Sequence, residues 1–337
     1  MHVVSSDKNI GYGKAAINMT EVFRKTGSSV NVMVSAKGGP AADIDFFLKP
    51  PPWNPGRAKR RIAHFYWEAI PLPRQWSCVI NTVNEIWAPC PLVATCCKEA
   101  GFKGRIEIVP TPALPMNYSD IPDIKFKGIN KDSFVFYSIF QWHNRKGWKE
   151  LLSAYFEEFT SSDNVCLVIK TNPINHMLQD QIVEDVRLFK SNIKNKDTAP
   201  LMLIPSIISE KELLSIHKAG HCYVAPHHGE GWGMPIHDAI LAGKQIIATK
   251  FGGVVEYLDD KSFHPIPFTM AQVTDMDWNG AYNSTQQWAQ PNVSALMSIM
   301  RDVYANHKLC IDKNMLINKN IEQLSFGGIL NLINGLI

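Results

Sequence analysis

The most informative segment of the chain follows a short apolar run and leads into a helical pattern. It reads His227-His228-Gly229-Glu230-Gly231-Trp232-Gly233-Met234-Pro235-Ile236-His237-Asp238. Three glycines within five positions allow close approach to the backbone, and Pro235 stands where a helix tolerates a missing N–H. Glu230 falls in the loop and Asp238 in the first helical turn, beside N–H donors that favour an anion. The segment predicts a pocket for a hydroxyl-rich ligand with phosphate, and an Asp238 that only complements the helix dipole is an equal alternative.

On both sides of this segment, apolar runs of strand length alternate with helical patterns. In the second half, strands are expected at residues 134–139, 165–170, 201–204, 222–225 and 245–249, with helices at 146–159, 176–193, 210–219, 235–242 and near 254–258. In the first half, apolar runs at 2–5, 29–35, 61–66, 85–88 and 105–109 alternate with helical patterns at 14–25, 74–83 and 92–100. Four prolines between residues 110 and 130 predict a linker. This pattern indicates two doubly wound α/β domains, with a ligand in the cleft between them at the carboxyl ends of the strands.

The composition is that of an ordinary globular protein large enough for two domains. Its 337 residues are 45% hydrophobic and 19% charged, which excludes a single small module, a disordered chain and a coiled coil. No apolar run approaches the ~20 residues that span a bilayer, and the first ten residues are too polar for a signal sequence. Seven cysteines include no C-x-x-C pair, and the adjacent Cys96 and Cys97 do not bridge easily. We therefore expect a cytoplasmic protein without a membrane span.

A second short motif, Gly11-Tyr12-Gly13-Lys14, follows the first expected strand and opens the first expected helix. Backbone N–H groups at such a turn can face an anion. A Walker A loop is excluded because Lys8 stands where its first glycine is needed, and the dinucleotide fingerprint fails at Ala16. An anion site built on Gly11 and Gly13 and a bare turn are equal alternatives.

The segment from Glu230 to Asp238 closely resembles the E-x7-E signature of retaining glycosyltransferases of the GT-B fold, the family-four group that includes bacterial mannosyltransferases. Trp232 stands for the usual aromatic residue, Met234 for the leucine and Asp238 for the second glutamate. Four further segments resemble the family: Tyr66-Trp67-Glu68 with Leu72-Pro73 and Trp76, Asn84-Glu85-Ile86-Trp87-Ala88-Pro89, Gly252-Gly253-Val254-Val255-Glu256, and Trp288-Ala289-Gln290-Pro291-Asn292-Val293 before a helix with Arg301 and Tyr304. Five segments in the right order argue against a chance match.

The resemblance implies two Rossmann-like domains that face an interdomain cleft. Residues 1–115 would bind the acceptor, residues 116–312 the nucleotide sugar, and residues 313–337 would form a helical segment that packs back towards the first domain. The implied reaction moves a sugar from a nucleotide sugar, such as a UDP- or GDP-sugar, to an acceptor hydroxyl. It would retain the anomeric configuration and need no metal and no permanently bound cofactor.

The resemblance also implies roles for individual residues. Glu230 would contact hydroxyls of the donor sugar, and Asp238 would contact the ribose, although its side chain is one methylene shorter than glutamate. Lys146 matches the family's lysine that holds the leaving diphosphate, and Arg145 is the candidate for its arginine. Lys170, at an expected strand end, is a further phosphate candidate, with a solvated lysine as the alternative. The implied donor site comprises Gly11, Gly13, Arg145, Lys146, Lys170, Glu230, Gly231, Trp232, Gly233, Met234 and Asp238. Cations there would stabilise the charge that grows on the diphosphate as its bond to the sugar breaks.

Two residues of the first half are candidates to accept or orient the proton of the acceptor. Glu68 lies within one of the matching segments, and His64 is four residues before it. We expect Glu68 to take this catalytic role beside Glu230 and Lys146, and His64 to be a buried structural residue.

The charge is unevenly distributed. Residues 1–115 contain 14 Lys and Arg against eight Asp and Glu, and a basic cluster consists of Arg57, Lys59, Arg60 and Arg61. One interpretation is a solvated face. The other is contact with an acidic acceptor: a phosphate-bearing or lipid-linked saccharide at a membrane surface, or DNA whose hydroxymethylated pyrimidines would receive the sugar. A nucleotide-sugar-binding protein without catalytic activity is a third hypothesis.

Metal candidates are few. Asp43-Ile44-Asp45 and Asp275-Met276-Asp277 spell the D-x-D string of metal-dependent GT-A transferases, but neither follows a clear strand. The adjacent His227 and His228 have no cysteine or aspartate at a zinc spacing. We expect no metal site.

Overall fold

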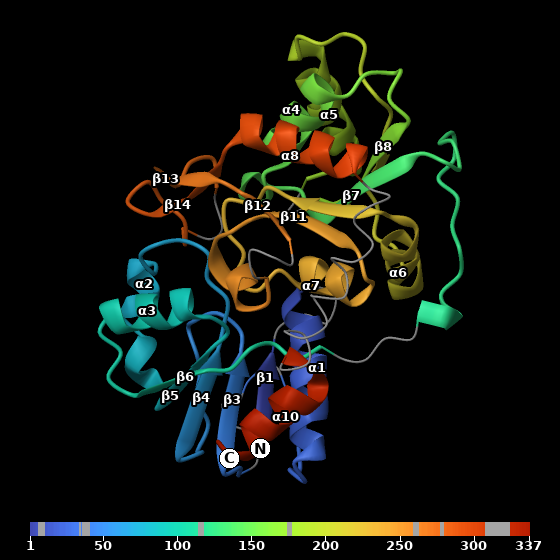
Figure 1. Cartoon of the computed structure of the whole chain (residues 1–337). Coiled ribbons are helices and arrows are strands. Elements are labelled where there is room, and N and C mark those ends of the chain that lie inside the picture. The colour runs from blue at the N-terminus through green and yellow to red at the C-terminus, as the bar shows by residue number, and fades with distance from the viewer. Residues whose placement is uncertain are drawn as a thin grey trace.

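The computed structural model describes residues 1–5, 11–33, 35, 41–113, 118–173, 177–258, 263–276, 280–306 and 324–337. Several predicted features lie outside these residues: Val34, residues 114–117 of the linker, His176, Asp277 and residues 313–323 of the C-terminal segment. Figure 1 shows two α/β units stacked one above the other, with the first half of the chain below the second.

The first unit is built on a parallel six-stranded sheet in the order β2-β1-β3-β4-β5-β6. Its strands are β1 (His2–Ser5), β2 (Asn31–Met33), β3 (Ile44–Leu48), β4 (Arg60–His64), β5 (Glu85–Ala88) and β6 (Arg105–Ile108). Its helices are α1 (Gly11–Lys25), α2 (Arg74–Ser77), the 3-10 turn η1 (Ile80–Thr82) and α3 (Pro91–Glu99). The helix expected over residues 74–83 is therefore broken into two short pieces.

The sequence prediction missed β3, the strand between β1 and β4. The segment contains Asp45, an unusual residue for a central strand. In the structure the Asp45 carboxylate is buried and lies 3.0 Å from Nδ1 of His2, while the backbone N–H of Gly56 donates to it at 2.8 Å. Because these polar partners compensate for its burial, Asp45 is a structural residue of the first sheet rather than half of a D-x-D metal motif.

The second unit has a parallel six-stranded sheet in the order β12-β11-β10-β7-β8-β9. Its strands are β7 (Phe134–Gln141), β8 (Val165–Asn172), β9 (Leu201–Ile204), β10 (Cys222–Ala225), β11 (Gln245–Thr249) and β12 (His264–Ile266). The helices of this half are η2 (Tyr118–Asp120), η3 (Asn144–Lys146), α4 (Trp148–Glu158), α5 (Gln179–Asn192), α6 (Glu210–Ala219), α7 (Met234–Leu241), η4 (Gly252–Glu256) and α8 (Val293–Ala305). The two parallel sheets with helical crossovers confirm the prediction of two Rossmann-like domains.

An antiparallel hairpin of β13 (Phe268–Gln272) and β14 (Gln287–Pro291) was also missed by the sequence prediction. It joins the two domains, because Ile70 and Gln287 exchange two backbone hydrogen bonds of 2.9 and 2.7 Å. Tyr282, in the loop between the two strands, stacks on Trp67 of the first domain with ring centroids 4.7 Å apart. The hairpin therefore belongs to the second half of the chain but packs on the first domain.

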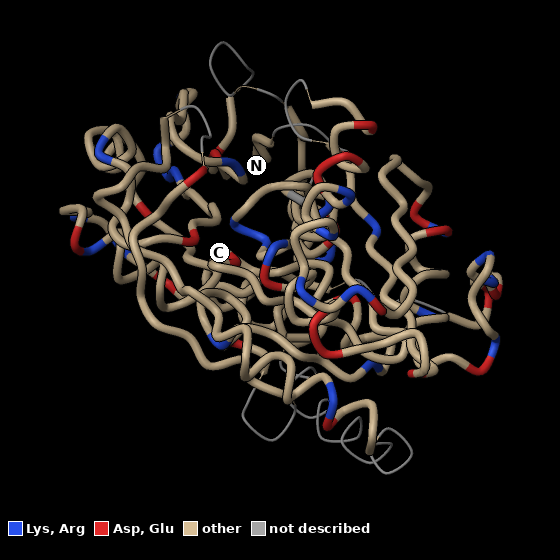
Figure 2. Tube along the Cα trace, turned by 90° about the horizontal axis from the view of Figure 1, so that it is seen from above, with Lys and Arg blue, Asp and Glu red and all other residues tan. Residues whose placement is uncertain are grey.

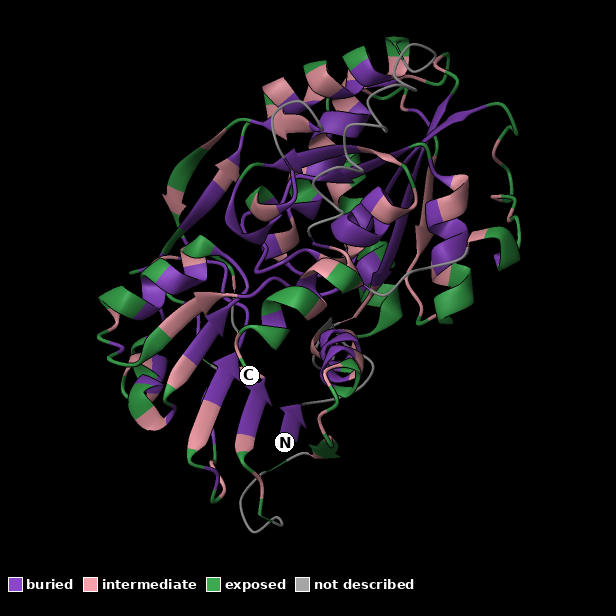
Figure 3. Ribbon diagram, turned by 60° about the horizontal axis from the view of Figure 1, so that its bottom comes forward, coloured by how far each residue is buried: buried purple, intermediate pink, exposed green. Residues whose placement is uncertain are grey.

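The last described helix, α10 (Phe326–Asn334), packs against α1 of the first domain, as Figure 1 shows. Nη2 of Arg60 donates to the carbonyl oxygen of Leu336 at 2.7 Å, so the end of the chain is tied to the first sheet. The central strands of both sheets are buried, whereas the edge strands β2, β6 and β9 are exposed or partly exposed (Figure 3). Within the described residues, no helix combines the length and apolarity needed to cross a membrane.

Candidate active site

The site is formed where the loops after β7 and β10 meet. The peptide N–H of His228 donates to the carbonyl oxygen of Arg145 at 2.8 Å. Gly147 has a positive φ of 68°, and a Cβ there would lie 1.8 Å from the carbonyl oxygen of Pro226. A glycine is therefore required at position 147 for both its backbone conformation and its space. Because both loops follow carboxyl ends of neighbouring parallel strands, they project towards the first domain.

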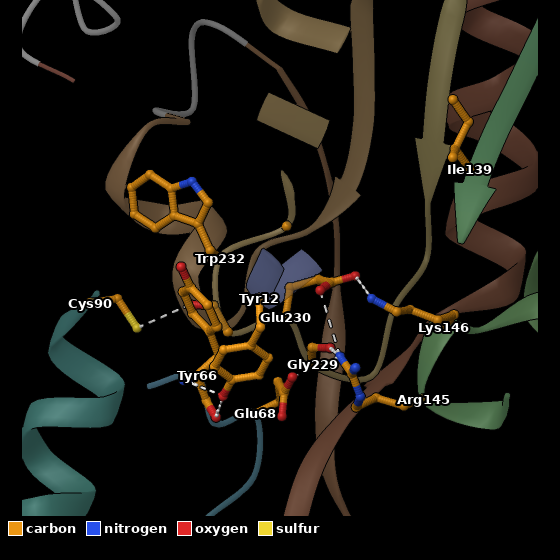
Figure 4. Close-up of polar contacts among 12 residues, drawn as sticks. Tyr12, Tyr66, Glu68, Cys90, Ile139, Arg145, Lys146, Gly229, Glu230 and Trp232 are labelled. Atoms are coloured by element: carbon orange, nitrogen blue, oxygen red, sulfur yellow. Dashed lines mark hydrogen bonds and ion pairs between the residues drawn. The ribbon is translucent and has the colours of Figure 1, made fainter. Parts of the chain in front are cut away.

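Glu230 lies between the two predicted diphosphate cations (Figure 4). Its Oε1 accepts a hydrogen bond from Nζ of Lys146 at 2.5 Å, and its Oε2 lies 3.6 Å from Nη1 of Arg145. Burial disfavours the charged carboxylate, but the charges of Lys146 and Arg145 outweigh it and lower the pKa of Glu230 to about 2. Burial lowers the pKa of Lys146, with the charge of Glu230 acting in the opposite direction. The structure thus places these three predicted residues together.

Glu68 comes from the first domain and reaches the same cluster. Its Oε1 lies 3.2 Å from Nη1 of Arg145, and its Oε2 accepts a hydrogen bond from the hydroxyl of Tyr282 at 2.7 Å. Tyr282 was not found from the sequence, because it lies in a loop without a local pattern and meets Glu68 only through the fold. Two carboxylates, two cations and one phenol therefore form one buried network across the domain interface.

Two glycines of the motif, Gly229 and Gly231, allow the loop to pack closely against the first domain. A Cβ on Gly229 would lie 2.3 Å from the carbonyl oxygen of Glu68, and one on Gly231 would lie 2.5 Å from Cβ of Tyr66. On the other side, the N–H of Gly253 in η4 donates to the carbonyl oxygen of Glu230 at 2.7 Å. The loop is therefore held between the first domain and η4. The sequence predicts that the glycines of the motif allow close approach of a ligand. In the structure, Gly229 and Gly231 instead allow close approach of the first domain.

The next three residues of the motif position α7. Trp232 is only 2% exposed and packs against the rings of Tyr257 and His237. Gly233 caps the helix with a positive φ of 81°, and Met234 opens it. Trp232 is thus a core residue here, and its predicted contact with the donor remains a prediction, as do those of Gly231, Gly233 and Met234.

Asp238 is bound to the first domain. Its Oδ2 accepts a hydrogen bond from Nζ of Lys14 at 2.8 Å, and Lys14 lies in the first turn of α1 after Gly11 and Gly13. Burial raises the pKa of Asp238, and the positive charge of Lys14 opposes this shift. The glycine motif and the second acid of the E-x7-E segment therefore meet at the domain interface, although nothing in either motif alone predicts the pair.

Lys170 lies near the end of β8, opposite Ile139 of β7 in the sheet register. It is 6% exposed, and its Nζ lies 3.4 Å from Oδ1 of Asn172. Burial lowers its pKa. A buried lysine at a carboxyl strand end fits a phosphate ligand, and this role remains a prediction.

Of the buried histidines that the structure describes, five are held as neutral side chains: His64, His143, His217, His227 and His237. Burial lowers the pKa of His64 and His237 to about 4 and that of His217 and His227 to about 3, and it lowers the pKa of His143 as well. His64 stacks on Phe46 and contacts the ring of Tyr66, which agrees with the structural role expected for it.

These histidines predict acid instability that begins near neutral pH. The unfolded chain binds protons below about pH 6.5 whereas the folded side chains do not, so the free energy of unfolding falls as the pH drops from about 6.5 towards 4. Each histidine contributes at most about 1.4 kcal/mol per pH unit. Urea unfolding at pH 7.5, 6.0 and 5.0 measures the free energy of unfolding. His64→Phe should reduce the slope of this free energy against pH. Equal stability at pH 7.5 and 5.0 would contradict the neutral burial.

The basic cluster lies away from these residues. Arg60 opens β4, so it is at the amino edge of the first sheet, opposite the edge that meets the second domain. Its guanidinium binds the Glu85 carboxylate with bonds of 2.6 and 2.9 Å. Nε of Arg61 donates to Oδ1 of Asn84 at 3.3 Å. Figure 2 shows positive and negative residues mixed along the trace. Two of the four cationic side chains are therefore engaged in contacts within the first domain.

Among the residues that the structure describes, no three His, Cys, Asp or Glu side chains gather so that they could hold a metal ion. Both ring nitrogens of His228 have protein partners. Its Nδ1 lies 2.8 Å from the carbonyl oxygen of Ala289, and its Nε2 lies 3.3 Å from the Glu150 carboxylate.

Comparison with known proteins supports the two-domain α/β fold described above. Residues 120–266 match the family model described as "Glycosyl transferases group 1". The chain has the two-domain GT-B fold. Together, the family match and the similar structures support a glycosyltransferase. No curated protein sequence matched the chain.

Three solved structures illustrate the similarity. Anabaena Alr3699/HepE in complex with UDP and glucose is 11% identical, with a TM-score of 0.68 over 99% of this chain and 98% of its own. The UDP-forming α,α-trehalose-phosphate synthase of Burkholderia xenovorans, in complex with glucose-6-phosphate, is 10% identical, with a TM-score of 0.60 over 95% and 76%. A TarM variant of S. aureus, in complex with fondaparinux, alpha-GlcNAc-glycerol and UDP, is 12% identical, with a TM-score of 0.59 over 86% and 54%. At these identities the likeness shows the shared fold.

Proposed function

We propose that this chain is a retaining glycosyltransferase that moves a sugar from a UDP-sugar to an acceptor hydroxyl without an obligatory metal. One observation carries the proposal. The buried side chains of Glu230 and Arg145 form a cluster with the part-buried Lys146 at the carboxyl ends of β7 and β10, directly opposite the first domain. The resemblance of residues 230–238 to the E-x7-E signature supports retention.

The residues divide the chemistry as follows. The bond between the anomeric carbon and the diphosphate oxygen breaks, and the diphosphate leaves with the electron pair. Lys146 and Arg145 stabilise the charge that grows on it more strongly in the transition state than in the bound donor. The acceptor oxygen bonds to the anomeric carbon on the face that the diphosphate leaves, and its proton passes to a diphosphate oxygen. Glu230 holds the donor sugar through its hydroxyls. Domain contact excludes water that would otherwise hydrolyse the donor.

UDP is the favoured donor nucleotide because the similar structures of Alr3699/HepE and TarM contain it. A GDP-sugar is the second candidate. Asp238 is proposed to meet the ribose after exchanging its bond with Lys14, and Lys14 would then be free to approach the diphosphate. Gly13 directly precedes Lys14 in the first turn of α1, so its proposed contact with an anion would lie near this exchange.

The acceptor is proposed to be a saccharide hydroxyl. Tyr12 and Tyr66 offer an aromatic pair beside Glu68, with ring centroids 4.9 Å apart. An acidic acceptor, either a lipid-linked or phosphate-bearing saccharide or DNA, would have to use the basic cluster at the far edge of the first sheet. Arg60 and Arg61 of that cluster already contact Glu85 and Asn84, which leaves Arg57 and Lys59. That edge is poorly placed for the reacting hydroxyl but remains available for peripheral contact with a membrane or DNA.

Thermal unfolding with UDP, GDP and ADP tests the donor site. A ligand at 100 times its dissociation constant stabilises the fold by about 2.7 kcal/mol, so the correct nucleotide should raise Tm by several degrees. Release of UDP from a UDP-sugar then separates an enzyme from a non-catalytic binding protein. No stabilisation by any of the three nucleotides at millimolar concentration would contradict the proposed function.

A further inference from the structure

The carboxylate of Glu68 has both oxygens occupied. Oε2 accepts the hydroxyl of Tyr282 at 2.7 Å, and Oε1 lies 3.2 Å from Nη1 of Arg145. The residue is only 8% exposed. These two contacts hold the buried carboxylate towards Tyr282 and Arg145, so it has little freedom to turn towards an acceptor hydroxyl. The role of acceptor base that the sequence suggested for Glu68 therefore fits its contacts poorly.

The contacts that hold the Arg145 guanidinium are made by one nitrogen atom, Nη1. Its Nη1 donates to the carbonyl oxygen of Gly229 at 2.6 Å and faces the carboxylates of Glu68 and Glu230 (Figure 4). Its Nε is buried and finds no hydrogen-bond partner among the described residues. A buried N–H without a partner is costly, and beside a cluster of charged residues such a donor is available to a ligand. The guanidinium is thus anchored through Nη1 while another of its N–H groups is left unpaired.

The contacts that hold Arg145 come from both domains. Glu68 belongs to the first domain and Arg145 to the second. Tyr282, which holds Glu68, stacks on Trp67 and sits in the hairpin that pairs with Ile70 through Gln287. The close approach of Gly229 to the Glu68 carbonyl brings the same two segments together. Glu68 and Tyr282 therefore add to the anchoring that Gly229 and Glu230 give Arg145, and Glu68 does so only while the domains are in contact.

We propose that Glu68, held by Tyr282, is a positioning residue that orients Arg145 towards the donor diphosphate. The inference rests on the proposed function and deepens it, because it makes domain contact a condition for a complete phosphate site. Arg145 then stabilises the leaving diphosphate only when the first domain, which holds the acceptor, is in place.

Two charge-conserving variants test the proposal by calorimetric titration with UDP. Glu68→Asp keeps the charge but is one methylene too short to span to both partners, and Tyr282→Phe removes only the hydroxyl. Each should weaken UDP binding about tenfold, the usual effect of losing one charge-assisted hydrogen bond. Glu85→Asp is the matched control, because Glu85 also binds an arginine but at the far edge of the sheet. It should leave UDP affinity within about twofold.

A double-mutant cycle shows whether the effect passes through Arg145. In an Arg145→Lys background, the addition of Tyr282→Phe should change UDP affinity less than about twofold, because the group to be positioned is gone. Circular dichroism confirms that each variant is folded. Unchanged UDP affinity in Glu68→Asp and Tyr282→Phe would overturn the inference, and so would losses that add fully to that of Arg145→Lys. If the wild type bound no nucleoside diphosphate, the proposed function would fail first and this inference with it.

Discussion

Lys146→Ala is expected to lower the turnover of a UDP-sugar about 100- to 1,000-fold, the usual loss when one preorganised donor to a developing anion is removed. Nζ of Lys146 already lies 2.5 Å from Glu230 in the proposed donor site, so it can meet the leaving diphosphate by exchanging this carboxylate for it. The loss should appear in kcat more than in KM, because the charge on the diphosphate increases as the bond to the sugar breaks. UDP released over time is the measurement.

Lys218→Ala is the control for this experiment. Lys218 also makes an ion pair, with Asp123 at 2.8 Å, but that pair is half exposed and lies at the end of α6. Its removal should leave turnover within about twofold, since exposed ion pairs contribute little. A Lys146→Ala enzyme with more than half of the wild-type turnover would remove this residue from the chemistry.

The charge balance of this cluster explains why it contains two carboxylates rather than one. Lys146 and Arg145 lie side by side in a buried site, and two uncompensated cations there would cost several kcal/mol. Glu230 and Glu68 compensate them, one from each domain. A diphosphate that enters must replace at least part of this compensation, so donor binding and rearrangement of the carboxylates are coupled.

The segments that the sequence predicted well are those whose signals are local. β10, the glycine-rich loop and α7 follow one another within about 20 residues, and the strand, Pro235 and helix pattern of this stretch are readable in order. The helix expected over residues 210–219 is α6, and it begins with a local signal, a capping box in which Ser209 and Glu212 bond reciprocally. Strong short-range patterns of this kind specify an element before any tertiary contact is made.

The features that were missed depend on contacts between distant residues. β3 is a central strand although it contains Asp45, because His2 and Gly56 supply partners that only the folded sheet brings together. The pair of Glu68 and Tyr282 is separated by 214 residues, and that of Lys14 and Asp238 by 224. No period or spacing in the chain encodes such pairs, so the sequence could nominate Glu68 and Asp238 but not the side chains that hold them.

Gly231→Ala is expected to separate donor binding from transfer. A Cβ at this position would lie 2.5 Å from Cβ of Tyr66 and 3.1 Å from its Cα, so the first domain must move away. A displacement on the order of 1 Å at a reacting centre can cost about 100-fold in rate, and we expect a loss of kcat of this size. UDP affinity should fall only about tenfold, the same loss expected when Glu68 no longer anchors Arg145.

Gly327→Ala is the matched control, because a Cβ on Gly327 meets nothing closer than 3.8 Å and the residue lies within α10. This variant should be slightly more stable than the wild type, by up to about 1 kcal/mol, with unchanged turnover. Urea unfolding, UDP titration and UDP-sugar turnover are measured on both variants. If Gly231→Ala lost UDP affinity and turnover by the same factor, domain contact would contribute to binding alone. A selective loss of turnover would mean that the glycine is needed because the two domains must touch for the sugar to move.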